Sequence, residues 1–172
     1  KEQVEHAEAV TNEFRKKVGT KMKIFFVVPD YFSDRPKKCM NGWGEVFMIV
    51  TANGDVLPCH SARVLPGMVF PNVKERGLEW VWKDSPAFNK YRGDSWMKEP
   101  CRTCPDKEKD LGGCRCQAFL LAGDAEIADP VCTLSPYHHV IEKAIEESNI
   151  AISSNPEGRA GSSWRSRTPS PA

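Results

Sequence analysis

The chain has 172 residues, a formal net charge of +1 and 27% charged residues. This is enough sequence for one domain with a hydrophobic core and short appendages. The near-neutral charge provides no global field that would favour nucleic acid or an anionic membrane as a partner. The longest apolar run, residues 24–28, is far shorter than the roughly 20 residues of a membrane helix. No secretory signal pattern opens the sequence, and we expect a cytoplasmic protein.

The first 28 residues predict a helix followed by a strand. Residues 1–19 carry an apolar stripe at helical spacing, and Gly19 can end the helix. The apolar run at residues 22–28 is rich in aromatic and β-branched side chains and predicts a buried strand. A helix, a short loop and a buried strand form one unit of an α/β sheet or barrel. We therefore interpret residues 1–34 as the last unit and linker of a partial barrel, in a piece of a longer protein.

A β-hairpin is predicted next, with strands at residues 45–51 and 56–60. Between them, Asn53 and Gly54 can supply the positive φ angles that a tight primed turn needs. Cys39 and Cys59 flank this hairpin. Antiparallel pairing would therefore bring their two thiols close together.

The rest of the chain predicts short helices and a disordered tail. The helices are expected at residues 78–83, 86–91, 117–122 and 135–148. Ser85 is expected to cap the second of them, and Pro86 suits its first position. The aromatic side chains expected in the core are Trp80, Trp82, Phe88 and Tyr91. The buried stripe expected on the last helix is Val140, Ile141, Ala144 and Ile145. Residues 149–172 lose periodicity and are expected to be disordered.

Seven cysteines are the unusual feature of the sequence. They are Cys39, Cys59, Cys101, Cys104, Cys114, Cys116 and Cys132. An odd number cannot pair fully within one chain, and structural disulfides are rare in a reducing compartment. The C-x2-C and C-x-C spacings in the loop at residues 101–116 let neighbouring sulfurs point into one site. We therefore expect the cysteines to bind metal as thiolates.

Zinc is the main alternative to iron–sulfur clusters, since structural zinc also takes C-x2-C pairs. Zinc sites more often combine two such pairs or add histidines, whereas here the second pair is C-x-C and Cys132 is isolated. We expect His138 and His139 to be exposed and His60 to hydrogen-bond locally. The spacing favours iron–sulfur clusters and leaves zinc open.

Asp110 is the candidate for an eighth ligand. Seven thiolates are too many for one four-ligand site and too few for two. Asp110 lies between Cys104 and Cys114, and its carboxylate can bind iron through oxygen. The following Gly112 and Gly113 would let the backbone turn tightly and approach a cluster closely. Asp110 also suits a solvated charge within the charged run 106–110, so chemistry alone leaves its role open.

The spacing of these residues resembles the seven-cysteine pattern of SPASM domains. The pattern here is Cys39-x14-Gly54-x4-Cys59, then Cys101-x2-Cys104-x5-Asp110-x3-Cys114, then Cys132. SPASM domains are the C-terminal auxiliary-cluster domains of radical S-adenosylmethionine (SAM) enzymes that modify peptides, and they usually have cysteine where this chain has Asp110. Residues 112–119, Gly-Gly-Cys-Arg-Cys-Gln-Ala-Phe, are similar to the PqqE-type enzymes of pyrroloquinoline quinone (PQQ) biosynthesis. The resemblance spans roughly residues 20–148.

The resemblance implies two interleaved groups of ligands. The first ligand set, for one auxiliary cluster, is Cys39, Cys59, Cys114 and Cys116. The second ligand set, for another auxiliary cluster, is Cys101, Cys104, Asp110 and Cys132. Cys116 is absent from the general pattern and completes the first set. The implied fold is α+β, with residues 35–148 forming a SPASM-type domain of a β-hairpin, short helices and cysteine-rich loops.

The resemblance also implies an activity for the full-length protein. PqqE-like enzymes are radical SAM oxidoreductases that form a carbon–carbon bond between a glutamate and a tyrosine side chain of the precursor peptide PqqA. They use SAM, a catalytic [4Fe–4S] cluster, an external electron donor and the peptide chaperone PqqD. The two auxiliary clusters, [4Fe–4S] or at one site [2Fe–2S], would accept or relay electrons.

One departure limits what this chain can do alone. The catalytic cluster of radical SAM enzymes needs C-x3-C-x2-C, and this sequence has no such triplet. We therefore expect the chain by itself to be inactive and to contribute the auxiliary-cluster module. A zinc-stabilised interaction module and the SPASM domain of an enzyme that acts on another peptide are the alternatives.

Overall fold

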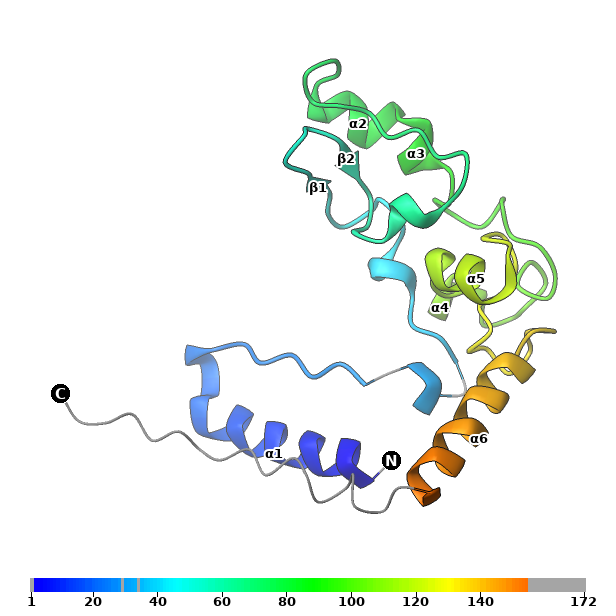
Figure 1. Ribbon diagram of the computed structural model, residues 1–172. Helices are drawn as coiled ribbons and strands as arrows, with labels where there is room; N and C mark the ends of the chain where they lie inside the picture. The colour runs from blue at the N-terminus through cyan, green and yellow to red at the C-terminus, as the bar shows by residue number, and fades with distance from the viewer. Residues whose placement is uncertain (1, 29, 34, 155–172) are drawn as a thin grey trace.

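The computed structural model describes residues 2–28, 30–33 and 35–154 (Figure 1). Short helices and loops make up most of this part of the chain. The helices are α1 (Glu2–Val18), α2 (Leu78–Asp84), α3 (Pro86–Asn89), α4 (Lys107–Asp110), α5 (Arg115–Ala122) and α6 (His139–Ser154). The strands β1 (Ile49–Val50) and β2 (Val56–Leu57) form a two-stranded sheet. None of the helices in these ranges has the length and apolar character of a membrane span.

The helix predicted at residues 1–19 is confirmed as α1, but no residue of it is buried. An extended segment runs back along this helix, and Arg15 Nε donates a hydrogen bond to Ile24 O at 3.0 Å (Figure 1). The strand predicted at residues 22–28 is wrong within the described chain, which assigns no strand there. A strand requires a hydrogen-bonded neighbour, and no described segment pairs with this one. Phe14 and Phe25 are consequently 52% and 73% exposed.

The predicted β-hairpin is confirmed, although each strand has only two residues. The strands pair antiparallel, with Ile49 opposite Leu57 and Val50 opposite Val56. The turn differs from the expected primed turn, because Gly54 alone in the loop has a positive φ, +97°. The Gly54 N–H donates to the carbonyl of residue 51. This geometry is typical of a three-residue loop that closes on a glycine bulge.

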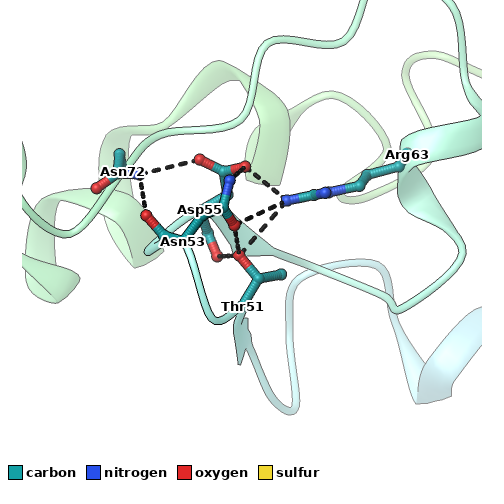
Figure 2. Close-up of polar contacts among 5 residues, drawn as sticks. All are labelled: Thr51, Asn53, Asp55, Arg63 and Asn72. Carbon is teal, nitrogen blue, oxygen red and sulfur yellow. Dashed lines mark hydrogen bonds and ion pairs between the residues drawn. The ribbon is translucent and has the colours of Figure 1, made fainter.

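A polar network fixes the hairpin loop to the chain that follows it (Figure 2). Asp55 Oδ2 accepts hydrogen bonds from Asn53 Nδ2 at 2.9 Å and Arg63 Nη2 at 2.5 Å. Asp55 Oδ1 accepts one from Asn72 Nδ2 at 3.0 Å, and the backbones of Asp55 and Asn72 form an isolated bridge. The hydrogen bond from Asn72 is the largest cause of a lowered pKa at Asp55. Three separate loops are therefore held around one carboxylate.

Two hydrophobic clusters form the core beside the sheet and the short helices. The first consists of Cys39, Trp43, Cys59, Ala62, Leu65, Tyr91, Cys116 and Ala125. The second consists of Val56, Val81, Ala87 and Phe88. The expected core role of the aromatic side chains is confirmed, since Phe88 and Tyr91 are buried and Trp80 and Trp82 pack against the second cluster. Cysteines thus supply much of the first cluster.

Two local predictions near the helix ends are wrong. Ser85 occupies the N-cap position of α3 but makes no capping hydrogen bond, and its buried Oγ has no partner. Helix α6 begins at His139 instead of Ser135, because Ser135 Oγ accepts the N–H of Tyr137 in a preceding turn. Helix α5 begins at Arg115, two residues before the predicted start.

Helix α6 also differs from the prediction in which of its residues are buried and in the residue at which it ends. Of the predicted stripe only Ile141 is buried, and Ile145 is 39% exposed. The helix continues to Ser154, so disorder from residue 149 is wrong for residues 149–154. Residues 155–172, the rest of the predicted tail, lie outside the described chain.

Gly44 offers a test of the packing between the loop after Cys39 and helix α3. A Cβ on Gly44 would lie 2.9 Å from Phe88 Cδ1, whereas nothing lies within 4 Å of a Cβ on Gly93. The φ angles of the two glycines, +63° and +66°, are nearly equal. We expect Gly44→Ala and Gly93→Ala each to lose about 1–2 kcal/mol of unfolding free energy for the left-handed backbone. Gly44→Ala should lose about 1–3 kcal/mol more through overpacking.

Urea unfolding of the metal-free chain measures both variants. Equal losses for Gly44→Ala and Gly93→Ala would contradict the close packing of Gly44 against Phe88.

Candidate metal centre

The first ligand set lies inside the first core cluster, where the loops on both sides of the hairpin meet helix α5. Cys39 begins a 3₁₀ turn, Cys59 follows strand β2, and Cys114 and Cys116 lie at the start of α5. Three of these side chains are buried and Cys114 is half-buried. The hairpin therefore does bring Cys39 and Cys59 into one region, and the helix adds the other two sulfurs.

The four thiols of the first set interact in a chain. Cys114 hydrogen-bonds with Cys39 and with Cys116, and Cys116 also hydrogen-bonds with Cys59. These contacts are the largest causes that raise the pKa of Cys39 and Cys116. The contacts with Cys116 are likewise the largest causes that lower the pKa of Cys114 to about 2 and of Cys59 to about 6. These hydrogen bonds therefore stabilise the thiolates of Cys59 and Cys114, and the thiolate is the form that binds metal.

Backbone N–H groups point at three sulfurs of the first set. The N–H of Ser61 donates to Cys59 Sγ at 3.4 Å. At the first turn of α5, the N–H of Arg115 interacts with Cys39, and those of Cys116 and Gln117 interact with Cys114. A helix N-terminus carries partial positive charge and stabilises anions. Such N–H groups also tune the reduction potential of a cluster held by these sulfurs.

The second ligand set also comes together, on the other side of the glycine turn. Cys101 interacts electrostatically with Cys104, Asp110 and Cys132, and Cys132 interacts with Cys104 and Asp110. The three cysteines are half-buried and none of the described cysteines forms a disulfide. Burial raises the pKa of Cys101 to about 11 and also raises that of Cys132. All eight residues singled out in the sequence therefore lie in two groups.

Asp110 is not a solvated charge, because it is only 5% exposed. Its Oδ1 accepts the N–H of Gly112 at 2.9 Å, and its Oδ2 accepts Arg35 Nη1 at 3.1 Å. Arg35 Nη2 also pairs with Asp106 at 2.8 Å and Arg35 interacts with Cys104. Arg35, which precedes the first cysteine, thus supplies a cation to the second set, a role that the sequence did not indicate.

The turn at Gly112 and Gly113 separates the two sets. Both glycines adopt a positive φ, +73° and +82°, as the predicted tight turn requires. A Cβ on Gly112 would lie 3.5 Å from Cys101 Sγ, and a Cβ on Gly113 would lie 2.5 Å from Asp129 Cβ. The backbone at Gly112 therefore approaches Cys101 of the second set, and two residues later the chain reaches Cys114 of the first set.

Asp129 positions Cys114 and was missed at the level of sequence. Its side chain is fully buried, and Oδ2 accepts the N–H of Cys114 at 2.8 Å. Oδ1 accepts Gln117 Nε2 at 2.9 Å and the N–H of Val131 at 3.0 Å. Burial raises the pKa of Asp129. The signal for this role was the Asp-Pro dipeptide, which favours a turn stabilised by the aspartate side chain.

The histidines bear on the zinc alternative, because structural zinc sites often add histidine to cysteine. No three His, Cys, Asp or Glu side chains in the described part of the chain are arranged to hold one metal ion. Thiolates on one zinc, at about 2.3 Å from the metal, would have to surround a common point. His139 is exposed, as expected, whereas His138, which was also expected to be exposed, is half-buried and places Nδ1 2.8 Å from the carbonyl of residue 130. His60 is exposed.

Residues 39–105 match the family model described as SPASM, an iron–sulfur cluster-binding domain. The matched residues include Cys39 and Cys59 of the first set and Cys101 and Cys104 of the second. The other four candidate ligands lie beyond the matched segment. This segment of the chain is therefore similar to SPASM iron–sulfur cluster-binding domains, and the mixed short helices and two-stranded sheet are compatible with that fold. The match supports membership of the radical SAM/SPASM family.

Asp129→Asn tests whether this carboxylate orients the first ligand set. The new NH2 group would face a hydrogen-bond donor in either orientation of the amide. At the position of Oδ2 it would face the N–H of Cys114, and at that of Oδ1 it would face Gln117 Nε2 and the N–H of Val131. We expect a loss of about 1–3 kcal/mol in unfolding free energy and lower iron uptake. Asp55→Asn is the control, since Asp55 accepts a similar number of side-chain hydrogen bonds, from Asn53, Arg63 and Asn72, none of which is a candidate ligand.

Unfolding and iron analysis of both variants give the answer. Asp55→Asn should lose stability but keep its iron. Wild-type iron content in Asp129→Asn would show that Cys114 needs no such support.

Proposed function

We propose that this chain supplies two auxiliary iron–sulfur clusters to a radical SAM enzyme of the PqqE type. The gathering of eight donors into two groups carries the proposal. The first group joins the loops around the hairpin to helix α5. The second joins the 101–104 loop, the end of α4 and Cys132. Each group draws on segments far apart in the sequence, so ligation energy is also folding energy for the domain.

When bound, the clusters supply one-electron acceptors. The chain's own contribution is the protein environment that sets how readily they accept. In the first set this environment is four sulfurs with backbone N–H groups pointing at three of them. In the second set it is three sulfurs and the carboxylate of Asp110, with Arg35 beside it. A shell of mixed thiolate and carboxylate gives the second site a different potential from the first.

The proposed substrate is the peptide PqqA, and the proposed reaction needs such an acceptor. A 5′-deoxyadenosyl radical, formed from SAM and one electron elsewhere in the full-length protein, removes a hydrogen atom from a glutamate side chain. The carbon radical adds to the tyrosine ring and forms the new carbon–carbon bond. Restoring the aromatic ring then requires the loss of one proton and one electron. The electron is the one that the auxiliary sites accept.

Asp110 and the stretch at residues 112–119 support the choice of PqqA over another peptide. The PqqE type shares both features, whereas the usual SPASM pattern has cysteine in place of Asp110. The proposal includes PqqD as the chaperone that presents the peptide, an external electron donor and a cytoplasmic setting. Incubating the full-length enzyme with SAM, PqqD and PqqA should give a peptide that has lost two hydrogen atoms. A crosslink formed only in a different peptide would end this part of the proposal.

Anaerobic reconstitution of the chain tests the cofactor assignment. We expect about eight irons and a matching amount of sulfide if both clusters have four irons, with broad visible absorption. Zinc binding without sulfide, in a colourless protein, would instead establish the zinc-stabilised interaction module and end the proposal.

The role of Asp110 is tested by two substitutions. We expect Asp110→Ala to weaken one cluster and Asp110→Cys to keep both clusters while shifting one reduction potential, because thiolate and carboxylate donate charge to iron differently. Iron analysis and EPR-monitored redox titration provide the measurements. Asp106→Ala is the control, since Asp106 shares the Arg35 contact but belongs to neither ligand set.

Unchanged iron content and potentials in Asp110→Ala would remove Asp110 from the ligand set. An equal effect of Asp106→Ala would assign the role to the ion pairs of Arg35.

A further inference from the structure

Arg115 lies between two candidate ligands in the sequence, yet its side chain is only 1% exposed. Its guanidinium is held by backbone carbonyls: Nε donates to Gly113 O at 3.2 Å, and Nη1 donates to Ala125 O and Ile127 O at 2.8 and 2.9 Å. Nη2 donates to Gly112 O. These bonds fix the cation against the glycine turn that separates the two ligand sets.

The guanidinium faces sulfurs of both sets. It interacts electrostatically with Cys39 and Cys114 of the first set and with Cys101 of the second. A Cβ on Gly112 would lie 3.2 Å from Arg115 Nη2 and 3.5 Å from Cys101 Sγ, so both atoms border this glycine. The ring of Trp96 covers the guanidinium, 4.6 Å from its centre. One buried cation thus lies beside ligands that come from different sets.

This cation has no direct carboxylate partner within the described chain. Within the described chain, its hydrogen bonds all end on backbone carbonyl oxygens, which carry no net charge. The carboxylate of Asp129 interacts with the guanidinium electrostatically, without a direct hydrogen bond between the two side chains. A buried charge without a paired opposite charge is costly, and arginine keeps its proton under all ordinary conditions. The carboxylate of Asp129 and the sulfurs of the two sets are the nearby groups whose negative charge can compensate.

We propose that Arg115 is a shared positioning residue that raises the reduction potentials of both auxiliary clusters. This inference rests on the proposed function, since it requires that both sets hold clusters. A cluster that accepts one electron gains one negative charge, and a fixed cation stabilises that form more than the oxidised form. The effect acts at short range in a site that excludes water, where electrostatic interactions are strong. Because the guanidinium faces both sets, both potentials respond to it.

Arg115→Met in the anaerobically reconstituted full chain is the main test, with dithionite as the reductant in an EPR-monitored titration. We expect both midpoint potentials to shift to more negative values. Arg92→Met is the matched control, because Arg92 also donates to backbone carbonyls, of residues 82 and 44, and lies over a tryptophan ring. The side-chain hydrogen bonds of Arg92 in the described chain all end outside the two ligand sets, so its loss should leave both potentials unchanged. Unchanged potentials in Arg115→Met with full iron and sulfide would overturn the inference.

Arg115→Lys decides the case in which Arg115→Met takes up no iron. Lysine keeps the charge but loses the planar fork that binds several carbonyls. Retained clusters in Arg115→Lys, with both midpoint potentials close to the wild-type values, support the role of charge. Loss of iron in Arg115→Lys as well would show that the carbonyl bonds alone matter and would overturn the inference. Failure of the wild-type chain to bind iron and sulfide would instead contradict the proposed function.

Discussion

The backbone turn at Gly112 and Gly113 determines how the rest of the domain is organised. Three segments meet there, because a Cβ on Gly113 would lie 2.5 Å from Asp129 Cβ and 2.8 Å from Pro36 Cβ. The N–H of Asp129 also donates to Gly112 O at 3.0 Å. Before the turn, Asp110 reaches the second ligand set, and after it the chain enters α5 with the first set. A side chain at residue 113 would force these segments apart and separate the two groups of donors.

The apolar core is small relative to the long loops that pack around it. Each strand has two residues, and the sulfurs of the first ligand set occupy the centre of the first cluster. Hydrophobic burial of that size gives limited stability by itself. Metal ligation contributes folding free energy wherever the site forms only in the folded chain. Packing, hydrogen bonding to sulfur and ligation therefore act on the same few residues.

The sequence was most informative where one local rule decided the outcome. The Asn-Gly dipeptide predicted the hairpin, although not its turn type, and the Ser-Pro start predicted α3. It failed where the outcome depended on distant partners: residues 22–28 lack a strand to pair with, and Ser85 is buried without forming its cap. In the site, cysteine spacing identified the candidate donors because few other roles suit so many thiols. The contacts of Arg35 and Arg115 left no comparable pattern, since each connects segments that only the fold brings together.

The central claim is that one loop alternates between two clusters. EPR of the reduced, reconstituted chain, compared between Cys116→Ser and Cys132→Ser, tests it most directly. Cys116 hydrogen-bonds with Cys59 and Cys114, whereas Cys132 interacts with Cys104 and Asp110. We predict two distinct signals in the wild type, of which each substitution changes a different one. A change in the same signal from both substitutions would contradict the alternating arrangement.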